Sequence, residues 1–521
     1  MILGLRRYLN WNKSNKNYSM KKTILSLLII IFVSNLSFAQ EPTLTKKQMY
    51  KDFDQLVKII EDCNVQLPVR KAVTGIDNLK EIKKLRKGID TVTTFKSFRQ
   101  LISDAIYLVR DPHSDITTTY YPEYDKLNNI DTTAINQLNQ LVNSKEKRNE
   151  NLISHFKNYS PIPAIKIEGN YYYYGDFIFH NQKKDSLKIH FMKLLTYNGQ
   201  EFQKYVDENF KGYKWDYDKK KYKSTSVLLK KDAVIEGEQD GIRYKFNLND
   251  YPMVDMGSLI TNISLEEIPK REEWDNNKII KYIERDSILY IYLPTMVTGD
   301  GDSLFYSQIK HIGREKKINK VVIDVRGNKG GNDLTWHKTL TAIVKDTLPY
   351  KIKLAFNDSK VMRKYYSDEY EVEKIKWLGN KKLRIIDINT YLAPDTNSIN
   401  FDGKIFILSD GGTYSAGHSI VTYADHLEQL VSIGTKTGHI VGFGLMAPLF
   451  QLNNSKLAFR LACVMDMTNC KKPIDVYHDT KEIEISPTFE ERVYSLTDLD
   501  TKSEEYLYNY DSWFRKVLEL E

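Results

Sequence analysis

The hydrophobic positions of the chain change their spacing from one region to the next. Across residues 44–110, apolar side chains recur every three or four positions, as on one face of an α-helix, and charged residues fill the opposite face. The pattern ends at Arg110-Asp111-Pro112-His113, where a proline cannot continue a helix. We therefore expect a small helical N-terminal domain over residues 40–118.

The rest of the chain shows two further patterns. Residues 119–160 are polar and rich in Asn and Lys, as in an insertion, and residues 161–277 carry short β-favouring runs separated by Gly and Asn. Over residues 278–500, near-continuous apolar runs alternate with helical patterns, which is typical of a parallel sheet covered by helices. We expect a multidomain α/β protein with a β-rich middle domain, an α/β core and a C-terminal helix over 501–521.

The first 39 residues have the layout of a secretory signal peptide. Lysines precede an apolar run over residues 24–33, and small residues stand at the cleavage positions before Gln40. That run is about half as long as a membrane-spanning helix requires. Met20 suits the start of the signal better than Met1, which would leave residues 1–19 outside it. We expect an exported protein, periplasmic or extracellular, with no membrane span after cleavage.

The positive charge of the chain comes mostly from this segment. The net charge is +8, and residues 1–39 contain six Lys and Arg residues and no acid, so removing them leaves +2. A nearly balanced mature chain gives no reason to expect a nucleic-acid partner.

The three cysteines, Cys63, Cys463 and Cys470, allow two interpretations. Cys463 and Cys470 are close enough in sequence to form a disulfide in an exported chain, and three isolated apolar thiols are the alternative. The sequence has no paired CxxC motif, no HExxH motif and no histidine cluster at ligand spacing. We expect no metal site and no cofactor.

Two glycine-rich loops follow buried strands of the predicted core and open helices. Residues 324–332 include Gly330 and Gly331, whose backbone N–H groups could face a ligand without obstruction, as in an oxyanion hole or a phosphate cradle. Residues 410–419 place Ser415 in the first turn of a helix, where the dipole and exposure favour a nucleophile. A plain strand–helix turn and an N-cap serine are the alternatives.

A nucleophilic serine needs a base, and His113 is the strongest candidate. It lies in a loop between Asp111 and Asp115, whose carboxylates can orient an imidazole and stabilise its charged form. A solvated loop histidine is the alternative, and His418 and His439 lie closer to Ser415 in sequence.

Together these segments resemble the C-terminal processing and tricorn-core serine peptidases, the tail-specific protease family. The matching segments span most of the chain and occur in the family's order. They are Asp111-Pro112-His113-Ser114 (D-G-H-[ST], the base), 194–202 (a PDZ-like segment), 324–331 (D-x-R-x-N-x-G-G), Thr413-Tyr414-Ser415-Ala416 (the nucleophile loop) and 433–438 (G-x-x-T-x-G).

The resemblance implies a PDZ-like middle domain, a ClpP/crotonase-like α/β core and the residue roles of the tricorn-like His/Ser branch. In that branch Ser415 is the nucleophile, His113 is the general base, and the N–H groups of Gly330 or Gly331 and of Ala416 hold the oxyanion. The family's third member is a glutamate near the end of the core. Its nearest matches here are Glu482 and Glu484.

The departures from the family pattern are specific. His439 stands where the processing branch has its lysine base, and His418 stands where a glutamate commonly follows the nucleophile. The terminal motif lacks its Gly and Asp. We expect an exported serine-type peptidase that cleaves peptides or unfolded protein tails, with the substrate bound by its C-terminal tail.

Two other functions fit parts of the pattern. One is a catalytically degenerate peptide-binding protein on the same scaffold. The other is an acyl-CoA enzyme of the crotonase type, which shares the strand–glycine–helix geometry. The serine loop and the export signal argue against the second, because CoA thioesters are cytoplasmic. Reaction with a fluorophosphonate separates an active peptidase from a binding protein, because only an activated serine reacts.

Overall fold

The computed structural model describes most of the chain after residue 41. The described residues are 42–118, 120, 125, 130–143, 159–167, 169–180, 186–210, 214–216, 221–223, 226–230, 232–250, 253–255, 278–299, 302–366, 371–375, 382–424, 427–435, 447–468, 470–477, 482–488, 491 and 500–520. The expected signal peptide 1–39, residues 436–438 of the turn motif and His439 lie outside them. Within the described ranges, no helix is long and apolar enough to span a membrane.

The first region is helical, as its periodicity predicts. The α3 helix begins with a capping box in which Thr45 and Gln48 satisfy each other's backbone N–H groups, and it buries Phe53, Leu56 and Ile60. Its elements are α3 (Lys46–Cys63), α4 (Gln66–Thr74), α5 (Asn78–Lys84), η1 (Leu85–Thr91), α6 (Phe95–Tyr107), the short strand β1 (Asp115–Thr117) and α7 (Thr132–Asn143).

The middle region is an antiparallel sheet with its own apolar core. Its strand order is β10-β9-β4-β3-β2-β8, with β5 beside β4 and β11 beside β3. Asn198 and Gly199 adopt positive φ angles at the turn after β4, as the Asn-Gly pair predicts. The elements are β2 (Tyr159–Ile167), β3 (Asn170–His180), β4 (Ser186–Tyr197), β5 (Gln200–Glu201), α9 (Phe202–Asn209), β6 (Lys214–Asp216), β7 (Lys221–Lys223), β8 (Ser226–Lys230), β9 (Val234–Gln239), β10 (Ile242–Asn247) and β11 (Met253–Asp255).

The third region is built on a six-stranded sheet of order β12-β13-β14-β18-β19-β23, parallel except for β12. From β13 to α12 and again from β18 to β19, strands alternate with helices, as the apolar runs and helical patterns of this region predict. The elements are β12 (Ile279–Ile283), β13 (Ile288–Tyr292), α11 (Asp302–Glu315), β14 (Lys320–Asp324), α12 (Leu334–Ile343), β18 (Ile405–Ser409), α14 (Ala416–Ala424), β19 (Leu430–Gly434) and β23 (Ile483–Glu484).

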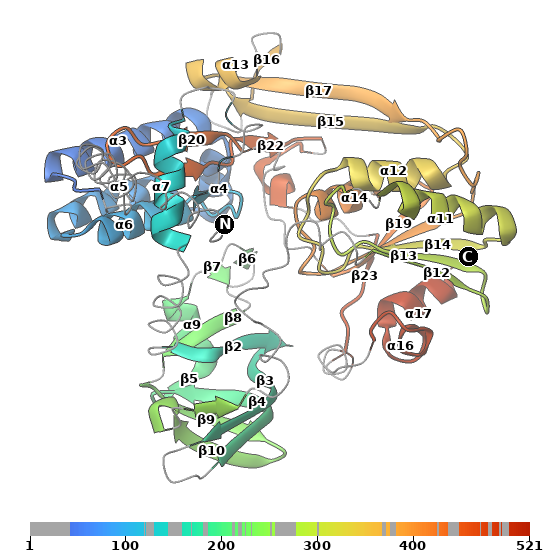
Figure 1. Ribbon diagram of the computed structural model, residues 1–521, viewed down its shortest axis with the longest axis horizontal. Helices are drawn as coiled ribbons and strands as arrows, with labels where there is room; N and C mark the ends of the chain where they lie inside the picture. Colours follow the sequence, from blue (N-terminus) through green and yellow to red (C-terminus); the bar gives the residue numbers. More distant parts are fainter. Residues whose placement is uncertain are drawn as a thin grey trace, which may run out of the picture.

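Alternate residues of these strands enter different helix layers, which explains why the strands are apolar throughout. Val321 and Ile323 pack with α11, α12 and α14, whereas Val322 and Tyr290 pack with the C-terminal helices (Figure 1). The sheet is therefore covered on both faces, and its carboxyl edge is left for the loops that follow β14 and β18.

The C-terminal segment forms two helices where the sequence predicted one. These are α16 (Glu504–Tyr510) and α17 (Ser512–Glu519), separated by Asp511 in an extended conformation. The break has a local cause, because the Asp511 carboxylate caps α17 by accepting the N–H of Phe514 at 3.0 Å.

Strands from the core region reach across to the helical region (Figure 1). The long antiparallel ribbon β15–β17 extends over both, and β1 pairs with β21 in a three-stranded sheet. The apolar core of the N-terminal helices is continuous with that of the sheet. These elements are β15 (Leu348–Asn357), α13 (Lys360–Tyr366), β16 (Glu371–Lys374), β17 (Lys382–Leu392), β20 (Leu449–Gln451), β21 (Ala458–Arg460), β22 (Val464–Asp466) and η6 (Pro473–Tyr477).

All three cysteines are free thiols, so the suggested Cys463–Cys470 disulfide is not formed. Cys463 lies instead beside Cys63 at the end of α3. Burial, and then the hydrogen-bonded thiol of Cys63, raise the pKa of Cys463 well above its usual value.

The mixed α/β, multidomain architecture expected from the sequence is confirmed. The finer division into a PDZ-like middle domain and a ClpP/crotonase-like core stays a prediction.

Candidate active site

Ser415 stands at a sharp turn between β18 and α14. Its φ of 54° lies in the left-handed region, which is costly for a residue with a side chain and is typical of constrained functional positions. The turn is fixed from both sides, because the Tyr414 N–H donates to Asn328 O at 2.7 Å and the Thr413 hydroxyl donates to Val325 O at 2.9 Å. The loop after β14 therefore holds the loop that carries the serine.

Gly330 makes the closest approach to the serine. A Cβ atom at Gly330 would lie 2.5 Å from Ser415 Cβ and 3.0 Å from its Oγ, and the φ of Gly330 is 98°. At Gly331, a Cβ atom would lie 2.4 Å from the backbone of Met296. Both positions require glycine, for space as well as for conformation.

The three predicted oxyanion donors differ in their hydrogen bonds. The Gly330 N–H donates to Asn328 Oδ1 at 2.7 Å, so it is already engaged. Among the described residues, the N–H groups of Gly331 and Ala416 donate to no acceptor. Ala416 is the first residue of α14, where backbone N–H groups have no partner within the helix. Of the three predicted donors, Gly331 and Ala416 are therefore the two whose N–H groups remain available.

His113 reaches this turn from the helical region, 302 positions earlier in the chain. Its Nε2 lies 3.2 Å from Ser415 Oγ, within hydrogen-bond distance. Its Nδ1 lies 3.1 Å from Asp111 Oδ1, which also accepts the His113 backbone N–H at 2.8 Å. The structure therefore brings together a serine, an imidazole and a carboxylate in one chain of contacts.

Asp111 is buried and ionised. Burial alone would raise the pKa of its carboxyl, but the hydrogen bonds of His113 and the charge of Arg70 hold that pKa below its usual value. A buried carboxylate in this state accepts hydrogen bonds, so it favours the imidazole tautomer that carries its proton on Nδ1.

The turn that carries His113 is held by the strands that cross from the core. Ser114 Oγ accepts the Ala462 N–H at 2.9 Å, and Asp115 pairs with Arg460 at 3.0 Å across β1 and β21. The position of His113 thus depends on a contact between the helical region and residues far along the chain.

Tyr414 is a contact that the sequence did not single out as a site residue. Its hydroxyl lies 2.6 Å from His113 Nδ1, and the two rings stack with centroids 4.7 Å apart. Its position directly before Ser415 was the available signal, but only the tertiary structure shows where the phenol lies.

The other predicted residues lie elsewhere. Glu482 and Glu484 are exposed side chains at the edge strand β23, and the carboxylate that contacts His113 is that of Asp111. His418 contacts Thr422 of its own helix, with 3.0 Å between Nε2 and Oγ1. Among the described residues, no group of three or more His, Cys, Asp or Glu side chains could hold a metal ion.

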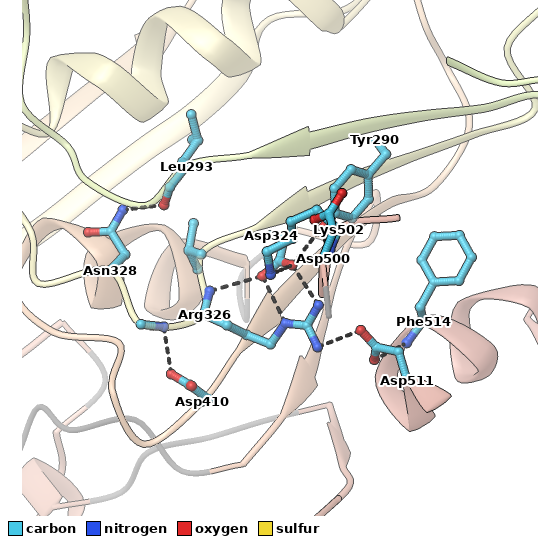
Figure 2. Close-up of polar contacts among 12 residues, drawn as sticks. Tyr290, Leu293, Asp324, Arg326, Asn328, Asp410, Asp500, Lys502, Asp511 and Phe514 are labelled. Atoms are coloured by element: carbon cyan, nitrogen blue, oxygen red, sulfur yellow. Dashed lines mark hydrogen bonds and ion pairs between the residues drawn. The ribbon is translucent and has the colours of Figure 1, made fainter. Parts of the chain in front are cut away.

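A buried network of charges fixes the start of the glycine-rich loop. Figure 2 shows Arg326 between Asp324 and Asp511, at 2.6 and 2.7 Å, with Lys502 3.2 Å from Asp324. Burial would raise the pKa of Asp324, but Arg326 and Lys502 hold it far below its usual value. Tyr290 also donates to this carboxylate at 2.6 Å.

A cavity of about 510 Å³ adjoins both loops. Gly327 and Gly412 line it from the loops, Tyr510 and Trp513 from the C-terminal helices, and Lys166 from strand β2 of the middle region. The middle region therefore shares a cavity wall with the loops that surround Ser415.

Comparisons with known proteins found a family match by sequence and several solved structures of similar fold. Residues 287–487 match the family model described as peptidase family S41. No protein of curated function matches the chain by sequence.

Similar solved structures include mature CPAF, at 11% identity and a TM-score of 0.55, with 92% of this chain and 98% of that chain covered. Mature CPAF complexed with lactacystin has 11% identity and a TM-score of 0.52, covering 91% and 98%. A putative peptidase from Parabacteroides merdae has 12% identity and a TM-score of 0.44, covering 91% and 96%. At such identities the likeness to CPAF shows a shared fold.

Proposed function

We propose that this chain, whose residues 287–487 match peptidase family S41, is an exported serine-type peptidase that cleaves peptides or unfolded protein tails. In this proposal Ser415 is the nucleophile and His113 is the general base. The observation that carries it is the 3.2 Å contact between His113 Nε2 and Ser415 Oγ, at a serine with a positive φ.

The reaction follows the logic of acyl transfer. His113 Nε2 takes the Oγ proton as Ser415 forms a bond to the peptide carbonyl carbon. The N–H groups of Gly331 and Ala416 hold the oxyanion, each donor contributing about 3 kcal/mol to transition-state stabilisation. His113 then gives its proton to the leaving amine as the C–N bond breaks, and water hydrolyses the ester to free Ser415.

Asp111 takes the orienting role for which the family resemblance suggested Glu482 or Glu484. Its carboxylate is buried, contacts His113 Nδ1 and is ionised at neutral pH, as orientation of the imidazole requires. An exposed glutamate on an edge strand would be screened by water and would stabilise the imidazolium less.

The middle region is proposed to bind the substrate tail. Its sheet ends in strands β8 and β10, and an extended peptide can add to such an edge through backbone hydrogen bonds. Lys166 of β2 lines the same cavity as Gly327 and Gly412, so a tail held there would lie near the catalytic loops. Export rests on the signal-like segment 1–39.

The test is active-site labelling with a fluorophosphonate probe. Wild type is expected to be labelled at Ser415, Ser415→Ala to be unlabelled, and His113→Ala to lose most labelling because its base is missing. His418→Ala is the matched control, since His418 lies one turn along α14 and contacts Thr422, and it is expected to label normally. A folded wild-type protein that does not react would contradict the proposal and favour a peptide-binding protein on the same scaffold.

A further inference from the structure

The hydroxyl of Tyr414 makes the shorter of the two contacts to His113 Nδ1. The phenol oxygen is 2.6 Å from Nδ1, whereas Asp111 Oδ1 is 3.1 Å away. The rings of Tyr414 and His113 also stack, with an interplanar angle of 28°. The imidazole of His113 is thus positioned by stacking on the Tyr414 ring and by two oxygen atoms near Nδ1.

The tautomer of His113 decides what this contact does. To accept the Ser415 proton, Nε2 must be unprotonated, so the neutral ring carries its proton on Nδ1. If Tyr414 donated to Nδ1 instead, the ring proton would stand on Nε2 and the base could not act. The ionised Asp111 carboxylate, which can only accept, favours the first arrangement, in which the phenol oxygen also accepts.

The backbone that positions Tyr414 is the backbone that positions the nucleophile. The Tyr414 N–H donates to Asn328 O, its carbonyl accepts the Gly417 N–H at 3.0 Å, and the next residue is Ser415. One short turn therefore fixes the nucleophile and one of the groups that orient its base.

We propose that Tyr414 is a positioning residue for His113: its phenol oxygen shares the Nδ1 proton with Asp111 and keeps Nε2 aimed at Ser415. The inference rests on the proposed function. When the imidazole gains the Oγ proton, the Nδ1–H bond to the phenol oxygen becomes charge-assisted and therefore stronger. Tyr414 would thus stabilise the charged ring more than the neutral one.

The experiment measures the rate constant of fluorophosphonate labelling from pH 5 to pH 9 for wild type and Tyr414→Phe. The phenylalanine variant keeps the stacked ring and removes only the oxygen. Its rate is expected to fall about 10- to 100-fold, as when a hydrogen bond to a charged group is lost. The midpoint of the acid limb should also move to lower pH, because the charged ring has lost an acceptor. Asp111→Asn should move it the same way.

Other titratable groups lie near Asp111 and His113. A control variant tests whether the loss of any tyrosine hydroxyl slows labelling. Arg70 and Cys463 interact with Asp111 and are left unchanged in all variants. Tyr306 lies on α11, and its hydroxyl donates to Thr335 O of α12 at 3.2 Å. The variant Tyr306→Phe removes this hydroxyl and is expected to be labelled at the wild-type rate.

Each outcome decides the matter. A slower Tyr414→Phe variant with an unmoved acid limb would reduce Tyr414 to a packing residue and overturn the proposal. A faster variant, or an acid limb moved to higher pH, would mean that Tyr414 donates to Nδ1 and holds the base back, which also overturns it. Failure of wild type to label at all would count against the proposed function, and normal labelling with an unaffected variant would count against this inference alone.

Discussion

Two segments meet at Ser415, and they are held in different ways. The glycine-rich loop after β14 is anchored by Arg326, which lies between two fully buried carboxylates (Figure 2). The turn that carries His113 is held by Ser114 and by the pairing of β1 with β21, at the contact of two regions.

The glycine-rich loop is made rigid by a buried ion network, whereas the position of His113 depends on how two regions of the chain dock. The loop is fixed by buried charges that water cannot solvate. Removing one charged partner therefore leaves the others buried and uncompensated, which costs a large amount of folding free energy. His113 is fixed by a few hydrogen bonds of ordinary strength between regions that are far apart in sequence. We expect changes in the loop to cost stability, and changes near His113 to cost reactivity first.

The largest effect is expected at the buried ion network. Arg326→Met removes the only cation between Asp324 and Asp511 that contacts both among the described residues, and should lower the free energy of unfolding by about 3–5 kcal/mol. Urea denaturation measures it. Asp500→Asn is the control, because its pair with Lys281 is long and exposed and should contribute under about 1 kcal/mol. Equal losses of stability in the two variants would show that the buried network stabilises the protein no more than an exposed pair does, which would contradict the distinction drawn between the two segments.

The next effect concerns the approach of the loop to the nucleophile. Gly330→Ala would place a Cβ atom 2.5 Å from Ser415 Cβ, and shifting the serine should lower the labelling rate about 100-fold. Gly327→Ala is the matched control, since its φ is also positive but nothing lies within 4 Å of the added atom. It should cost about 1–2 kcal/mol of stability and leave labelling intact. Similar rates for both variants would show that steric approach at Gly330 is unimportant.

Acid should affect both segments through their carboxylates. The pKa values of Asp324 and Asp111 are lowered by folding, so each stabilises the protein fully above the unfolded value of about 3.9. That stabilisation is lost as pH falls below about 4 towards the folded pKa, because the unfolded chain then binds more protons. Each unit of lowering corresponds to about 1.4 kcal/mol.

Urea denaturation between pH 2.5 and pH 5 measures this contribution. Asp324→Asn and Asp111→Asn should each flatten the loss of stability with acid, and the change should be larger for Asp324, which has two cationic neighbours. An unchanged slope in Asp324→Asn would be inconsistent with a lowered pKa there.

The smallest effect is expected where the two regions dock. Ser114→Ala leaves the buried Ala462 N–H without its acceptor, which should cost about 1–3 kcal/mol and lower the labelling rate several-fold as His113 shifts. Ser114→Thr keeps the hydroxyl and should restore both. Loss of stability without any loss of labelling would mean that other contacts position the base.

The sequence predicted the elements whose signal is local. Long apolar runs gave β13, β14, β18 and β19, because a strand buried on both faces has few polar positions. The helical spacing predicted α3 and α6 in the same way. His113 was a candidate base from its flanking carboxylates Asp111 and Asp115, and its pairing with Ser415 was also expected from the family resemblance.

Features that depend on distant partners were not predictable. The C-terminal segment was expected as one helix. Its sequence pattern does not reveal that Asp511 is extended between two helices and forms an ion pair with Arg326. The orienting glutamate was sought by motif at Glu482 or Glu484, whereas Asp111 contacts the imidazole because the chain turns back after Pro112. The signal peptide and the division into domains stay predictions.

The crossing of β20–β22 to the helical region has a consequence for the timing of synthesis. His113 leaves the ribosome early, but strand β21, which pairs beside its turn, follows some 340 residues later, and Asp511 comes later still. A chain that is still being made cannot assemble the catalytic contacts. The proposed catalytic arrangement can therefore form only after nearly the whole polypeptide has been made.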